Sequence, residues 1–248
     1  GVGNIGASLA GRGSDDRSVS MVNNGTISIG RSAQRSLTDA SEDVPVNWVG
    51  VTGVAVTNAN FTNNGDITTG ALTHGVTAIK SVGGTVNQAG TITINSAYSP
   101  EGKVPAQSIA MDVWGLSQAE NSGTITLNGV NGVGLNVREK AEATNSGTIV
   151  VAQGIDGQSK TPNYGIVSQG KGAKATLTGN VDLTGDGAIG VYVKEGGVAA
   201  VDGGNVNFVS GVNQTGYVIH GTDSSITNSH SVQSVSTDGS TLDRKSVV

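Results

Sequence analysis

The chain has 248 residues, including 39 glycines against the average share of about 7%, and its aromatic content of 3% excludes an ordinary aromatic-rich core. Four prolines exclude a collagen helix, and the absence of cysteine excludes a disulfide scaffold and a thiol nucleophile. The net charge of −5 argues against a nucleic-acid partner, and no apolar run approaches the ~20 residues that span a bilayer.

The first recurring element is a glycine followed by a polar residue, an aliphatic residue, a polar residue and usually a second aliphatic residue. Its copies begin at Gly25, Gly65, Gly90, Gly123, Gly147, Gly179 and Gly204, with a weaker eighth over 229–232. Alternation with period two predicts a strand with one buried face. The residues expected to stack inward as a ladder are Ile27, Ile67, Ile92, Ile125, Ile149, Val181 and Val206.

A second strand motif precedes most copies of the first. Its copies begin at Gly53, Gly75, Ser108, Gly134, Gly165, Gly190 and Gly216, each 12 to 15 residues before the next copy of the first motif. Where nothing is inserted, the whole period is 24 to 26 residues. This predicts one coil of a parallel β-solenoid, with two or three strands per coil. The Asn-Gly and Ser-Gly pairs are expected to supply left-handed backbone angles at the corners.

An antiparallel sandwich is the competing all-β fold. It would also produce alternating strands and frequent turns. It does not explain why the same residue types return at one register, so the solenoid is preferred. Seven intervals of about 4.8 Å predict a rod roughly 35 Å long.

Three insertions interrupt the period, at about 30–50, 95–107 and 152–164, and all four prolines fall inside them. They follow the first, third and fifth coils, which predicts protrusions from one corner, about 10 Å apart. Such loops either bind a partner or reflect neutral drift at a tolerant corner, and both interpretations stay open. The candidate binding residues, aromatic rings for stacking and cations for anionic groups, are Arg31, Trp48, Tyr98, Lys103, Lys160 and Tyr164.

No catalytic, metal-binding or cofactor-binding residues are predicted. The three histidines lack a credible serine or carboxylate arrangement, and His220 is expected to be structural. A polysaccharide lyase or hydrolase remains an alternative, because such enzymes also use β-helices, but it would need clustered outward carboxylates. Asp66 and Asp182 are expected four coils, about 19 Å, apart. Ice binding by the Thr91/Thr93 and Thr124/Thr126 pairs is a further alternative, weakened by the interruptions in that array.

The repeated Asn-Ser-Gly-Thr-Ile (121–125 and 145–149) and Asn-Asn-Gly-Thr-Ile (23–27) resemble the passenger domains of Gram-negative autotransporters, most closely the self-associating adhesins. The resemblance covers about residues 20 to 232. It implies a right-handed parallel β-helix of about eight coils, displayed on the bacterial surface by a C-terminal membrane barrel. Residues 1–248 are then one passenger fragment, with the signal peptide and the barrel outside it, and 233–248 are expected to fray.

The resemblance also implies adhesion, and the lack of a credible catalytic arrangement leads us to expect no enzymatic activity. Self-association with copies on neighbouring cells, leading to aggregation and biofilm formation, is the preferred mechanism, because repeated polar ladders multiply weak contacts. A host glycan or matrix protein bound through the corner loops is the alternative. Neither a nucleic acid nor a membrane segment within this fragment is expected.

Overall fold

A computed structural model describes residues 4–13, 18–30, 50–98, 106–152, 161–230, 233, 235 and 238–246. In these residues the chain forms three parallel sheets of nine, eight and seven strands, here called sheets A, B and C. Sheet A consists of β1 (Ile5–Ala10), β4 (Thr52–Thr57), β7 (Thr77–Val82), β10 (Ser108–Trp114), β13 (Gly132–Arg138), β16 (Tyr164–Gln169), β19 (Ile189–Lys194), β22 (Thr215–His220) and β24 (Thr241–Ser246).

Sheets B and C follow sheet A in each coil. Sheet B consists of β2 (Ser20–Asn23), β5 (Asn60–Asn63), β8 (Thr85–Gln88), β11 (Gln118–Asn121), β14 (Glu142–Asn145), β17 (Lys174–Leu177), β20 (Val198–Asp202) and β23 (Ser225–Ser229). Sheet C consists of β3 (Thr26–Ile29), β6 (Asp66–Thr69), β9 (Thr91–Ile94), β12 (Thr124–Leu127), β15 (Thr148–Val151), β18 (Asn180–Leu183) and β21 (Asn205–Phe208).

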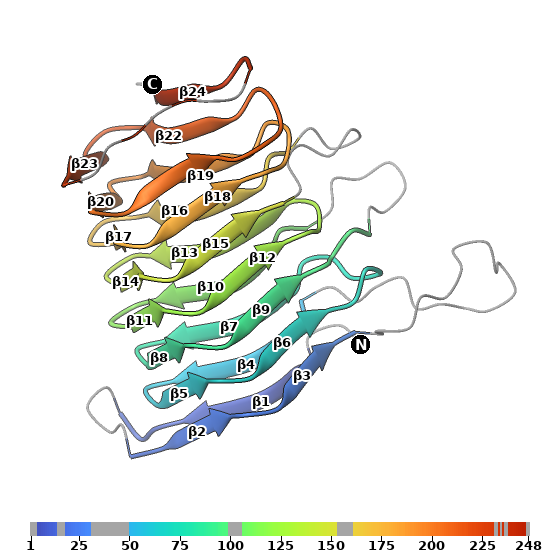
Figure 1. The fold of residues 1–248 in the computed structure, drawn as a ribbon. Coiled ribbons are helices and arrows are strands. Elements are labelled where there is room, and N and C mark those ends of the chain that lie inside the picture. Colours follow the sequence, from blue (N-terminus) through green and yellow to red (C-terminus); the bar gives the residue numbers. More distant parts are fainter. Residues whose placement is uncertain are drawn as a thin grey trace, which may run out of the picture.

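The coils wind into a right-handed parallel β-helix with three faces, as predicted (Figure 1). Strands inside each sheet hydrogen-bond to the strands three places earlier and three places later, except that β22 pairs with β24, so the backbone is satisfied between coils. The register of sheet C is the one expected from the first motif: Ile125 lies between Ile92 and Ile149. Of the eighth copy expected at 229–232, Ser229 ends β23 of sheet B, and 231 and 232 lie outside the described residues. Within the tail expected to fray, β24 pairs with β22.

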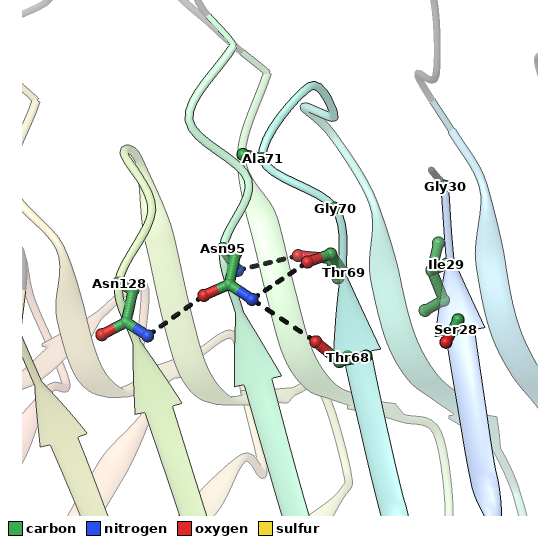
Figure 2. Close-up of a pocket in the computed structure, with 9 residues that line it drawn as sticks. All are labelled: Ser28, Ile29, Gly30, Thr68, Thr69, Gly70, Ala71, Asn95 and Asn128. Carbon is green, nitrogen blue, oxygen red and sulfur yellow. Dashed lines mark hydrogen bonds between the residues drawn. The ribbon is translucent and has the colours of Figure 1, made fainter. Parts of the chain in front are cut away.

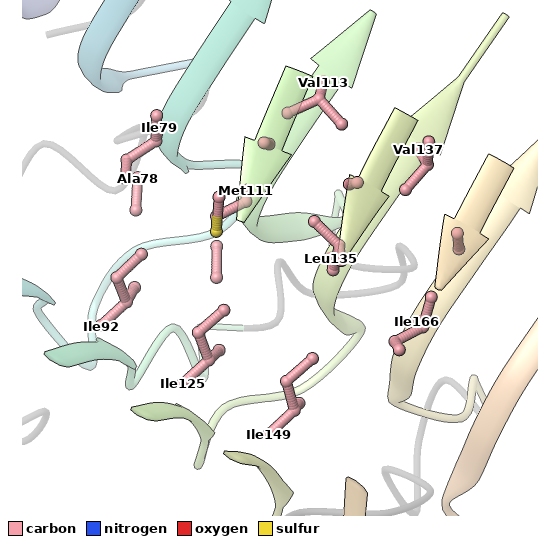
Figure 3. Packing of buried hydrophobic residues seen from close by; sticks show 14 of the residues in the cluster. Ala78, Ile79, Ile92, Met111, Val113, Ile125, Leu135, Val137, Ile149 and Ile166 are labelled. Atoms are coloured by element: carbon pink, nitrogen blue, oxygen red, sulfur yellow. The ribbon is translucent and has the colours of Figure 1, made fainter. Parts of the chain in front are cut away.

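The core is a narrow column of aliphatic side chains between the three sheets. Ile92, Ile125 and Ile149 of sheet C are fully buried and face residues of sheet A such as Met111 and Leu135 (Figure 3). Within the predicted inward ladder all residues are buried except Ile27 in the first described coil, which is partly exposed. Fully burying one such side chain contributes about 1.5–3 kcal/mol, which is how a fold almost without aromatics stays stable.

The corner glycines of the first motif are required for a different reason from the one predicted. None of Gly65, Gly90, Gly123, Gly147 or Gly179 has a positive φ angle. A Cβ at each would collide with backbone atoms one coil below, among them a glycine carbonyl oxygen. Close stacking of coils, and not left-handed geometry, therefore demands glycine here. Left-handed non-glycine residues lie mostly at the other two corners, for example Lys140 between sheets A and B and Asn131 between sheets C and A.

The second motif was misaligned in two coils. The residue in register with Gly53 is Ala78, not Gly75, and the residue in register with Gly134 is Ala110, not Ser108. These small residues let sheet A approach the ladder of sheet C; a Cβ at Gly134 would lie 2.8 Å from a side-chain methyl of Ile149. In the corrected register, the interval to the next corner glycine is 12 residues from Ala78 to Gly90 and 13 from Ala110 to Gly123.

Sheet B has no counterpart in the two predicted strand motifs, and it ends in a buried polar ladder. Asn23 donates to Asn63 (2.7 Å), Asn63 donates to Gln88 (2.6 Å), and Asn121 donates to Asn145 (2.6 Å). The asparagines among these amides come directly before the Asn-Gly and Ser-Gly pairs of the predicted corners, and their side chains turn inward. In the next two coils the same position is apolar, occupied by Leu177 and Val201.

Candidate functional site: the outer face of sheet A

The outer face of sheet A differs in chemistry from the faces of sheets B and C. On β10, β13 and β16 it carries a second apolar cluster, separate from the core, of Ile109, Val133 and Val167, against which Tyr164 and Tyr192 pack. Val133 is fully buried although it points away from the core. An apolar cluster on the outside of a solenoid provides a base on which polar side chains can be held in fixed positions.

A hydrogen-bonded network of polar side chains lies beside this cluster. Asp112 on β10 is buried and receives two hydrogen bonds from the Arg138 guanidinium, Nε to Oδ1 and Nη2 to Oδ2, both 2.9 Å long. The Asn136 amide donates to the same Oδ1 at 2.9 Å, and Gln169 donates to Asn136 at 2.8 Å. Bidentate, charge-assisted contacts of this kind fix the guanidinium plane. The network spans β10, β13 and β16 and is rigid before any ligand arrives.

Trp114, the last residue of β10, is 42% exposed, and the Arg138 guanidinium lies 5.7 Å from the centre of its ring. Both residues line a surface hollow of about 200 Å³, together with Glu139, Gln169, Gly170 and Glu195. The buried Asp112 carboxylate holds the Arg138 guanidinium, and the guanidinium holds the Trp114 ring. The ring is therefore a pre-positioned aromatic surface.

Aromatic side chains continue up the same face. Tyr164 stacks on Tyr192 with ring centres 5.4 Å apart, and His220 meets the edge of Tyr192 at 6.5 Å. Burial raises the pKa of Tyr164, and the neighbouring Tyr192 raises it further, so both hydroxyls stay protonated at neutral pH. A second hollow of about 690 Å³ lies beside His220 and is lined also by Lys171, Glu195 and Asp223. Glu195 lines both hollows, which therefore adjoin.

A third hollow, of about 400 Å³, lies at the far end of the sheet C strands (Figure 2). Asn128 donates to Asn95 at 3.1 Å, and the backbone N–H of Asn95 donates to the Thr69 hydroxyl at 2.8 Å. These polar groups satisfy one another, and the hollow offers no aromatic ring or charged side chain among its lining residues.

Two of the six predicted binding residues lie in the described part of the chain. Tyr164 was assigned to the third insertion, but it is the first residue of β16 and contacts Tyr192. The Tyr98 ring contacts the ring of His74, with centres 5.5 Å apart. Arg31, Trp48, Lys103 and Lys160 lie outside the described residues.

Sequence reasoning missed Asp112, Trp114, Arg138 and Tyr192. The alternation in β10 places Asp112 and Trp114 on the same face of the strand. This alternation can be read from the sequence and could have predicted that the two residues share a face. What could not be read from it is the pairing of Trp114 with Arg138, because they belong to neighbouring coils.

The carboxylates weighed for catalysis are engaged separately. Asp66 accepts a hydrogen bond from Thr91, and Asp182 accepts one from Asn207 at 2.7 Å. The searched part of the chain holds no group of three or more histidine, aspartate or glutamate side chains suited to a metal ion. It also contains no helix long and apolar enough to cross a membrane.

By its fold the chain is a three-faced, right-handed parallel β-helix with buried amides hydrogen-bonded between successive coils. A family model described as the BigA third pectate lyase-like domain matches residues 10–221, and the chain belongs to this family. BigA is an autotransporter-like adhesin, so the match supports the passenger-domain type predicted from the sequence. Searches of curated proteins and of solved structures give no match.

Proposed function

We propose that this β-helix is an adhesive segment of a bacterial surface protein that associates with copies of itself through the outer face of sheet C. The supporting observation is the composition of that face. On the described strands, its outward residues are threonine, asparagine and serine, together with one valine and two aspartates. The two aspartates, Asp66 and Asp182, are the only outward charges on these strands. Two such faces can meet at little cost in charge desolvation and exchange many hydrogen bonds.

Sheet B is less suited to this role. Its outward residues include Glu120, Glu142 and Lys174, and desolvating unpaired charges against a second copy is costly. Sheet C also presents its strands in unbroken register from β3 to β21, which makes the face regular along its whole length. A regular face lets two copies meet in one symmetric arrangement, in which the same residues of each copy contact one another.

The size of the face predicts a weak individual contact. Seven strands of four residues give a face of roughly 34 Å by 13 Å, or about 450 Å². A standard stable interface buries about 800 Å² per partner. One pair of fragments therefore associates weakly, and strong cell-to-cell adhesion comes from many copies acting together.

Sedimentation over a concentration series tests the proposal. The triple variant Thr93→Lys, Thr126→Lys, Thr148→Lys places three like charges on the face of sheet C and should keep the fragment monomeric at concentrations where the parent dimerises. The control Asn87→Lys, Thr144→Lys, Thr176→Lys adds the same charge to sheet B and should still dimerise. A parent that remains monomeric at every concentration, or equal loss in both variants, contradicts the proposal.

Binding of a host glycan or matrix protein through the corner insertions stays a prediction. It depends on Arg31, Trp48, Lys103 and Lys160 outside the described residues, together with Tyr98 and Tyr164. A Trp48→Ala variant that loses binding on a glycan array, without a change in self-association, would support it.

A further inference from the structure

The end of β10 and the turn after it expose two large apolar side chains to water. Trp114 is 42% exposed and Leu116, two residues later, is 62% exposed. Leu116 has no role in the network around Asp112, whereas Trp114 is held against Arg138 and lines the hollow shared with Glu139, Gln169, Gly170 and Glu195. One exposed indole is positioned by an arginine, which is itself held by a buried aspartate and two amides. Such support for an exposed ring indicates that the ring binds a ligand.

The charges around the hollow favour an uncharged ligand over an anionic one. The Arg138 guanidinium is paired with Asp112, the Glu195 carboxylate lies 3.5 Å from the Lys194 ammonium, and Glu139 also lines the hollow. An anionic ligand therefore meets two ion pairs and the carboxylate of Glu139, with no unpaired cation among the lining residues. A cationic ligand meets the guanidinium already lying against the Trp114 ring. An uncharged ligand meets hydrogen-bond acceptors on both glutamates and further N–H donors on Arg138.

The volume of the hollow is consistent with a single sugar ring. Its volume of about 200 Å³ is below the roughly 300–1,000 Å³ of pockets for drug-sized ligands and suits a single ring. The larger hollow beside His220 adjoins it through Glu195, along the direction in which the coils stack. A chain of rings laid along the rod would therefore reach both.

We propose that the Trp114 hollow is a binding site for an uncharged oligosaccharide, with one ring packed on the indole and its hydroxyls bonded to Arg138, Glu139 and Glu195. The adjoining hollow at His220 holds a following ring. The site lies on sheet A, so it is independent of the self-association face on sheet C.

Saturation-transfer NMR with uncharged hexasaccharides tests the site directly. The probes are cellohexaose, xylohexaose, mannohexaose and N-acetylchitohexaose, with a galacturonic acid hexamer as the anionic comparison. We expect saturation of ring C–H protons in at least one uncharged probe, with binding nearly independent of salt because no net charge is exchanged. Trp114→Ala should weaken that binding about tenfold or more, the usual effect of truncating a central aromatic contact.

Two further variants separate a binding role from a structural one. Trp114→Phe keeps an aromatic ring and should retain part of the binding, and Leu116→Ala removes the neighbouring exposed side chain and should bind like the parent. Far-ultraviolet circular dichroism checks that all three fold. No binding by any uncharged probe, salt-sensitive binding of the galacturonic acid hexamer alone, or equal losses in Trp114→Ala and Leu116→Ala would overturn the proposal. Sedimentation of Trp114→Ala should show unchanged self-association.

Discussion

At the scale of single residues, the helix depends on positions where a coil touches the coil below. Gly123 lies at the corner between sheets B and C, directly over Gly90, where a methyl group has no space. Asn145 lies in the same corner with its side chain fully buried and hydrogen-bonded to Asn121 and to the backbone oxygen of Asn180. Contacts between coils therefore require a residue without a side chain at Gly123 and an amide at Asn145.

Substitution of Gly123 by alanine should destabilise the protein. The added Cβ must displace the backbone of the preceding coil, and overpacking of this kind costs about 1–3 kcal/mol. Gly13→Ala is the matched control, because a Cβ there meets nothing within 4 Å. Urea unfolding followed by circular dichroism should show a lower midpoint for Gly123→Ala only. Equal midpoints would mean that the corner opens without cost.

At the scale of elements, the amide ladder links the ends of successive sheet B strands, but it is interrupted between β8 and β11. The Gln88 amide nitrogen and the Asn121 amide oxygen are both buried without a hydrogen-bond partner. They are a donor and an acceptor at paired positions, since Gln88 lies in register with Asn121. Gln88 is one methylene longer than the asparagines, which explains the mismatch.

Replacing Gln88 by asparagine should repair the ladder. Satisfying both buried groups is expected to stabilise the fold by about 1 kcal/mol, because an unsatisfied buried polar group costs about 1–3 kcal/mol. Asn145→Ala breaks an intact step and should lower stability by a similar amount. Opposite shifts of the urea midpoint are expected for the two variants. A fall in both would show that the longer glutamine fills space that asparagine leaves empty.

The corner between β6 and β7 should make stability depend on pH. His74 is buried there, its Nδ1 accepts the backbone N–H of Ala106 at 3.2 Å, and burial lowers the pKa of His74 below its ordinary value of 6.5. The unfolded chain therefore binds a proton at a higher pH than the folded chain does. The stability contributed by neutral His74 is complete above about pH 6.5 and is lost as the pH falls below that value.

Thermal unfolding between pH 7.5 and 5 measures this effect. The melting temperature of the parent should fall over that range, and His74→Gln should flatten the part of the fall between pH 6.5 and 5. His220→Gln serves as the control, since His220 lies on the outer face of sheet A. Identical pH profiles for the parent and His74→Gln would exclude the role of this buried imidazole.

At the scale of the whole molecule, the rod is built from coils that tolerate insertion at one corner, between sheets C and A. Uninterrupted corners there are short: four residues separate Leu127 from Gly132, and seven separate Thr69 from Thr77. Deleting 31–47 would leave five residues between Ile29 and Thr52, within the observed span. The hydrogen-bonded pairing of β4 with β1 and β7 should then form without the inserted segment.

The deletion variant should therefore keep the β signal in circular dichroism and unfold near the parent's midpoint. Shortening this connection from 22 to five residues lowers the entropic cost of closing it by about 1.3 kcal/mol, which is small against the core. If the deletion abolishes folding, residues 31–47 are part of the structure and not an insert. Its self-association should match that of the parent, because sheet C is unchanged.

The sequence by itself determined the repeat, the inward ladder from Ile67 to Val206 and the corner that receives the insertions. These follow from period-two alternation and from the spacing of glycines, which are local properties of the chain. Only the tertiary structure decided which side chains meet between coils: Trp114 with Arg138, Asp112 with Asn136, and the asparagines that turn inward at the end of sheet B. Residues about 24 positions apart become neighbours only when the coils stack in one register. The second motif, misaligned by three residues in one coil and by two in another, conceals such pairs.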